Sequence, residues 1–209
     1  MDKKEMGFLE ILSDDVHRAL QNLGSGATAS DRRNVLRTII SATEGLAWTY
    51  RSHILSIATD MGAVSKMEEL AFSEFTILVN DSGKISKQYR NVPLIASIRL
   101  TTHLAKSMAP HISVDFGTME WENLKLAIKA RNRVTHPKTN ADLSVSDEDI
   151  EKAKSGFFWI AALMLDVMEG AVKAFSSYVS EVADVLDDLA NGDPATLSMY
   201  NRVLKELDG

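Results

Sequence analysis

The stretch Ser144–Gly192, SVSDEDIEKAKSGFFWIAALMLDVMEGAVKAFSSYVSEVADVLDDLANG, indicates the fold class. Ser146 stands where a helix N-cap is expected, and acidic residues follow it at the positive end of the helix dipole. Asn191 and Gly192 are residues that typically end a helix. The stretch therefore predicts one very long helix. Its apolar run Phe157–Leu165 is too short to span a bilayer and is typical of a buried helix.

The rest of the chain shows mainly the same helical periodicity. We expect Ser30, Ser65 and Thr118 to cap three of the further helices, and Pro93 to open a fourth. The expected ranges are 8–23, 31–59, 66–72, 93–108, 119–136 and 194–207. Long antiparallel helices joined by short loops predict a mainly α-helical bundle.

One segment, Phe75–Tyr89, has a different pattern. Thr, Ile, Leu and Val cluster before Asn80-Asp-Ser-Gly83, and a second short run follows the turn. This order is typical of a strand, a tight turn and a second strand. We expect a small β-hairpin inserted into the helical bundle near residues 75–89.

Composition limits the class of protein. The 209 residues suit a single domain, 1–209, with 45% hydrophobic and 25% charged residues, as in soluble globular proteins. The chain has no cysteine, which excludes disulfides, thiolate metal sites and cysteine nucleophiles. The N-terminal residues lack the uninterrupted apolar core of a signal peptide. We therefore expect a cytoplasmic protein without a membrane segment.

The net charge of -6 excludes a uniformly basic nucleic-acid binder, but the charge is unevenly distributed. Residues 1–81 carry a net charge of -4, residues 82–141 carry +7 and residues 142–209 carry -9. The basic middle can form an anion-binding patch. Alternatively, the three blocks interleave in space and no patch forms.

The basic block ends in Lys129–Lys138, KARNRVTHPK, which contains no acidic residue. Cations near a helix C-terminus interact favourably with its dipole, and Pro137 prevents further helix, so the segment can simply be a helix end. That interpretation leaves Asn132 unexplained, because Asn is a mediocre helix former.

Helical geometry brings some of these side chains together. Asn132 and His136 lie about 40° apart around a helix, whereas Arg131 and His136 lie about 140° apart. His136 precedes a proline, which disfavours the α conformation, so the chain can turn there and bring the imidazole back towards Arg131. A permanent cation, an amide and a base that titrates near neutral pH would together suit a phosphodiester.

The pattern Arg131-Asn132-x-x-x-His136 resembles the Arg-polar-x-x-x-His signature of the HEPN superfamily. Members are α-helical bundles, and many are metal-independent ribonucleases of prokaryotic defence or toxin–antitoxin systems. The resemblance covers roughly residues 31–60 and 93–190. It implies an HEPN-like bundle that cleaves single-stranded RNA by attack of the 2′-OH.

The resemblance also implies roles for individual residues. Arg131 and His136 would be the catalytic pair and Asn132 the polar position; Lys129, Arg133 and Lys138 are the cations expected to bind RNA. Neither a metal nor another cofactor is required. Each chain supplies only one such His, and family members dimerise through the motif, so a homodimer is expected.

Two features concern how such a protein would be regulated and whether it would be catalytically active. Lys138 stands where members inhibited by nucleotidyl transfer carry a Tyr, so that regulation is not carried over, although a regulatory protein partner is possible. The alternative function is a catalytically inactive helical module that binds a protein or a nucleic acid.

Overall fold

The computed structural model describes residues 7–24 and 26–207, and its longest element is helix α6, Asp147–Ala190. The Ser146 hydroxyl accepts the Asp149 N–H at 3.1 Å, and the Asp149 carboxylate accepts the Ser146 N–H at 3.0 Å. This reciprocal capping box starts the helix. The helix ends at Ala190 with Asn191 as its C-cap, and Gly192 follows with a φ of 76° in the left-handed region. The prediction of one very long helix is confirmed.

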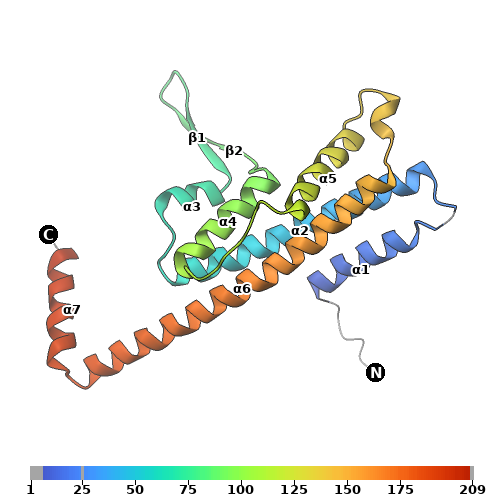
Figure 1. Ribbon diagram of the computed structural model, residues 1–209. Coiled ribbons are helices and arrows are strands. Elements are labelled where there is room, and N and C mark those ends of the chain that lie inside the picture. Colours follow the sequence, from blue (N-terminus) through green and yellow to red (C-terminus); the bar gives the residue numbers. More distant parts are fainter. Residues whose placement is uncertain (1–6, 25, 208–209) are drawn as a thin grey trace, which may run out of the picture.

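Helices α2 (Ala29–Asp60) and α6 form the centre of the bundle (Figure 1). Helix α5 (Met119–Thr135) packs on both of them, while α1 (Phe8–Gln21) and α4 (Leu94–Met108) pack on α2. The predicted mainly helical bundle is therefore present.

The shorter elements also lie close to the predicted positions. Helix α3 spans Lys66–Phe72 after its N-cap Ser65, and helix α7 spans Pro194–Leu207. A short 3₁₀ helix, η1 (Asn140–Leu143), connects α5 to α6 and was not predicted.

The start of α2 corrects one prediction. The cap is Thr28, not Ser30: the Thr28 hydroxyl accepts the Asp31 N–H at 3.2 Å, and the Asp31 carboxylate accepts the Thr28 N–H at 2.8 Å. Asp31 stands three residues after Thr28, whereas Arg33 stands three residues after Ser30 and has no acceptor oxygen in its side chain. The hydrogen bonds from the Thr28 backbone and hydroxyl lower the pKa of Asp31.

The core lies where α5 and α6 meet α2. Gly156 of α6 permits the closest approach, because a Cβ atom there would lie 2.7 Å from Leu124 Cα of α5. Next to this contact, the indole of Trp121 packs on Phe116 and Trp159, with ring centroids 4.8 and 5.2 Å away. These contacts fix α5, and therefore its C-terminal end, against α6.

The hairpin consists of β1 (Phe75–Val79) and β2 (Ile85–Tyr89), paired antiparallel with Phe75 opposite Tyr89 and Val79 opposite Ile85. The prediction of a small hairpin at residues 75–89 is confirmed. It projects from the bundle, and most of its side chains are exposed (Figure 1).

Glu74 anchors the base of the hairpin to α2. Its φ of 55° is in the left-handed region, which is unusual for a residue with a Cβ atom. Its carboxylate lies 3.0 Å from the Arg51 guanidinium and accepts the Tyr89 hydroxyl at 3.1 Å. Burial alone would raise the pKa of Glu74. The hydrogen bond and charge of Arg51, together with the hydrogen bonds from Tyr89 and Val92, outweigh this effect, so the pKa of Glu74 is lowered.

Helix α6 is longer than the bundle that it joins. Its C-terminal end runs beyond the other helices, and α7 turns away from that end (Figure 1). Within the described residues, α6 is the one helix long and apolar enough to cross a membrane, but 44% of its apolar window is buried in the bundle. Partial burial of this kind is consistent with the core helix of a soluble protein.

Candidate functional site

The candidate site is the C-terminal end of α5. Thr118 caps the start of the helix by accepting the Trp121 N–H at 3.3 Å. The last helical residue is Thr135, and His136 leaves the helix with φ -123° and ψ 59°. The His136 N–H still donates to the Asn132 carbonyl at 3.0 Å. The helix therefore ends where the proline was predicted to end it.

Arg131 does not turn towards His136. Its guanidinium forms an ion pair with the Glu44 carboxylate of α2, which lies 87 positions earlier in the chain. The Arg131 side chain is 23% exposed and that of Glu44 is 46% exposed. The cation thus lies at the surface of the seam between α2 and α5, partly neutralised by a carboxylate.

Asn132 and His136 lie on the solvent side of the helix end. Both are exposed, and their side chains form no hydrogen bond with any described residue. Lys129 is also exposed, seven residues before His136 and therefore on the same side of the helix. Helical spacing places Lys129 and Asn132 on one exposed face that leads to His136, while Arg131 is paired with Glu44 on the side of α2.

Other residues hold the helix end in place. The Arg37 guanidinium of α2 donates to the Val134 carbonyl at 3.3 Å. Arg133 donates to the Ser144 carbonyl at 2.9 Å, and its guanidinium lies 3.5 Å from the Asp149 carboxylate. Free carbonyls at a helix C-terminus need donors, and Arg37 supplies one to Val134. Arg133 instead ties the helix end to the loop before α6.

The loop after the helix is closed by Asp142. Its carboxylate accepts the backbone N–H groups of Lys138 and Thr139 at 2.9 and 2.8 Å. These hydrogen bonds, first from Lys138 and then from Thr139, lower the pKa of Asp142. The Lys138 side chain is exposed and forms no ion pair within the described part of the chain. Lys129 and Lys138 therefore remain as cations available to an anionic ligand.

Two residues of the site, Arg37 and Glu44, were not found from the sequence. They are seven residues apart on α2 and so face the same side of that helix. The spacing of Arg37 and Glu44 shows that they lie on the same face of α2. Only the packing of α2 against α5 shows that this face contacts Val134 and Arg131.

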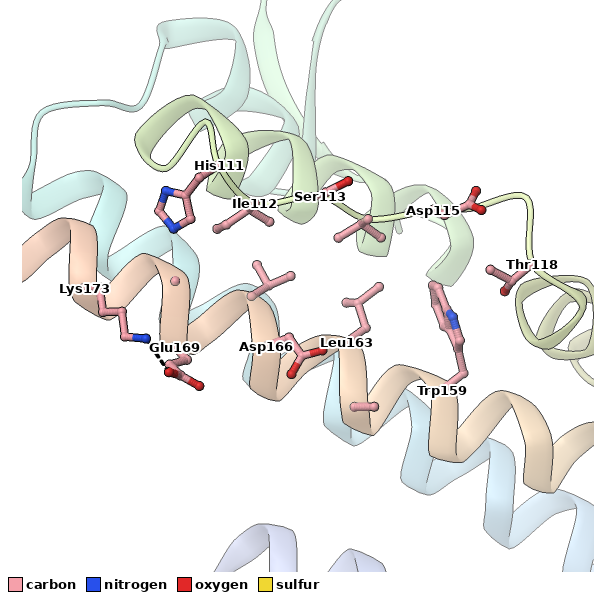
Figure 2. Close-up of a pocket in the computed structure, with 14 residues that line it drawn as sticks. His111, Ile112, Ser113, Asp115, Thr118, Trp159, Leu163, Asp166, Glu169 and Lys173 are labelled. Atoms are coloured by element: carbon pink, nitrogen blue, oxygen red, sulfur yellow. Dashed lines mark hydrogen bonds and ion pairs between the residues drawn. The ribbon is translucent and has the colours of Figure 1, made fainter.

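A separate cavity of about 610 Å³ lies between α6 and the segment that joins α4 to α5. Figure 2 shows His111 near one end of it, beside the ion pair of Lys173 and Glu169, and Trp159 towards the other end. None of the residues predicted from the motif lines this cavity.

Comparisons of the chain with models of protein families, with curated proteins and with solved structures found no significant match. The assignment from structure is a mainly helical bundle with a two-stranded hairpin. The HEPN-like interpretation rests on Arg131, Asn132, His136 and their position at the end of α5.

Proposed function

We propose that the chain is a metal-independent endoribonuclease that cleaves single-stranded RNA at the C-terminal end of α5. The proposal is supported by a difference between two sets of residues at that end: one set bonds the backbone, and the other is exposed. Arg37, Arg133 and Asp142 satisfy the backbone of the helix end and its loop. Asn132 and His136 are left exposed and unbonded among the described residues, and so are available for a ligand.

The chemistry follows from the groups present. RNA is cleaved when its 2′-OH attacks the adjacent phosphorus and the bond from phosphorus to the 5′ oxygen of the next nucleotide breaks. The reaction leaves a 2′,3′-cyclic phosphate and a free 5′-OH. The His136 imidazole can take or give the proton, Asn132 can orient the RNA, and Arg131 can stabilise charge on the phosphate. Lys129 and Lys138 would bind flanking phosphates.

The reaction needs one group that takes a proton and one that gives a proton, and each chain offers one His at this site. A homodimer that brings two α5 ends together across a two-fold axis would supply the second His. It would also allow Arg131 of one copy to approach His136 of the other. This arrangement is part of the proposal.

One observation favours a second candidate function, an inactive helical module that binds a nucleic acid or a protein. The Glu44 carboxylate pairs with Arg131 and reduces its attraction for phosphate. Within one chain, Arg131 also lies on a different side of the helix from His136. A module of this kind would use the exposed cations for binding and would not cleave RNA.

Binding and cleavage measured on the same variants separate the two functions. If the chain is a ribonuclease, His136→Ala should abolish cleavage of a labelled single-stranded RNA. The affinity of this variant for the RNA, measured by fluorescence anisotropy, should change little. Arg131→Lys is also expected to fail, because a single ammonium cannot replace the two-pronged contact of a guanidinium.

The matched control is His53→Ala, which removes another exposed imidazole, on α2 and outside the site. Full cleavage by the control and none by His136→Ala supports the ribonuclease. Binding of RNA by the wild-type protein without cleavage would support the inactive module instead.

A further inference from the structure

Helix α6 carries a second apolar stripe in its C-terminal part. Inside the bundle, a first stripe is buried by α2 and α5 at positions three or four residues apart and ends at Ala171. The second stripe has the same spacing but starts one residue later, so it lies on a neighbouring face of the helix. Its positions are Val172, Phe175, Val179, Val182, Leu186 and Leu189. Alternating steps of three and four residues form the heptad seam by which one helix packs along another.

The end of α6 runs beyond the other helices (Figure 1), and four of the six seam side chains are exposed, whereas Phe175 and Leu189 are half-buried. Val172 is 54% exposed, Val179 48%, Val182 40% and Leu186 59%. Helix α7 adds further exposed apolar side chains, among them Met199 at 61%. Together they offer apolar surface on the order of several hundred Å², the scale of the roughly 800 Å² that each partner contributes to a specific interface.

The charges of this segment lie away from the seam. The positions that flank a heptad seam hold Ser176, Tyr178, Ala183, Val185 and Ala190, all uncharged. Glu181, Asp184, Asp187 and Asp188 fall on the outer positions. Two copies of the segment can therefore meet along the seam without placing like charges against each other.

We propose that the C-terminal half of α6, residues 172–190, is a self-association surface that pairs antiparallel with the same segment of a second copy. The seam is symmetric about its midpoint. Antiparallel pairing places Val179 opposite Val182, Phe175 opposite Leu186 and Val172 opposite Leu189. Every layer of the seam is then filled by two apolar side chains.

Charge favours the antiparallel direction. The four acidic residues lie in the second half of the segment, from Glu181 to Asp188, whereas the first half has no acidic residue and its Lys173 is paired with Glu169. A parallel pair would place the two acidic halves side by side. An antiparallel pair places each acidic half beside a half without carboxylates, and it also opposes the two helix dipoles.

The same acidic residues argue against a lipid membrane as the partner that covers this surface. Helices that lie on membranes are typically rich in Lys and Arg on their polar face, which attracts anionic lipids. Here the outer face carries four carboxylates. This surface is also at the opposite end of α6 from the α5 site, so the proposal is independent of the ribonuclease function (Figure 1).

The first test is the mass of the full chain by light scattering at micromolar concentration. Val182→Glu places a carboxylate in the seam and is expected to lower the mass, with the helical circular dichroism of the bundle retained, whereas a dimer held by the α5 ends alone would keep its mass. Ser180→Glu adds the same charge two residues away on the outer face and should keep the wild-type mass. A monomeric wild-type protein, or equal masses for all three proteins, would overturn the proposal.

The second test uses the absence of cysteine from the chain. Val172→Cys and Leu189→Cys lie seventeen residues apart, about 25 Å along a helix, far beyond the reach of a disulfide. Antiparallel pairing predicts that a mixture of the two variants forms a disulfide-linked dimer on mild oxidation, while each alone does not. Linking of either variant with itself would contradict the antiparallel seam. Binding of a monomeric chain to phosphatidylcholine vesicles through Val182 would show a lipid surface instead.

Discussion

Replacing Gly156 with Ala tests whether α5 and α6 touch as closely as described. Ala is favoured over Gly inside a helix by about 1 kcal/mol. At this position, however, the new Cβ would lie 2.7 Å from Leu124 Cα and 3.1 Å from its backbone nitrogen. Backbone atoms cannot rotate away, so we take the overpacking cost at its upper end, about 3 kcal/mol. The net loss in the free energy of unfolding is then about 2 kcal/mol.

Gly45→Ala is the matched control, also in a helix. Its Cβ would meet mainly Leu12 Cδ1, the flexible end of a side chain on α1. We expect the free energy of unfolding to stay the same or to rise by up to about 1 kcal/mol. Urea unfolding followed by circular dichroism measures both variants. A Gly156→Ala protein as stable as the wild type would refute the close contact that fixes the end of α5.

Three further predictions concern the first turn of α2, the hairpin and the proposed RNA contacts. Thr28→Ala should lower the free energy of unfolding by about 1 kcal/mol, whereas Ser30→Ala should change it by less than about 0.5 kcal/mol. The pKa of Glu74 is lowered in the folded chain, so its stabilisation is present above its ordinary pKa of 4.5 and is lost as the pH falls through the lower, folded value. The difference in thermal midpoint between wild type and Glu74→Gln should therefore shrink in acid; a constant difference would show that the ionised carboxylate is not the cause. Lys129→Ala and Lys138→Ala should each reduce the slope of log affinity for single-stranded RNA against log salt by about 0.7, and an unchanged slope would exclude that lysine from phosphate binding.

Much of the secondary structure could be predicted because its signals are local. Thr118 and Ser146 cap helices through residues three positions away, and Pro93 opens α4. The one wrong cap, Ser30, shows the limit of such reasoning. Thr28, two residues before Ser30, also carries a hydroxyl, and the carboxylate of Asp31 makes Thr28 the cap.

The contacts of the candidate site could not be predicted in the same way. The end of α5 at His136 followed from Pro137, a neighbour in sequence. The pairing of Arg131 with Glu44 depends on how α2 and α5 are rotated against each other, which no local pattern specifies. The apolar run Phe157–Leu165 likewise indicated a buried helix, but it did not show that apolar residues near the C-terminal end of α6 are exposed.

The most direct test of the proposed function is cleavage of a single-stranded RNA in EDTA, compared with the same RNA carrying one 2′-deoxy nucleotide at the cleaved position. The proposal predicts that the wild-type protein cuts the first RNA and leaves a 2′,3′-cyclic phosphate. It also predicts no cut at the deoxy position, and none in either RNA by His136→Ala. Cleavage at the deoxy position, full activity of His136→Ala, or an RNA left intact by the wild-type protein would contradict it.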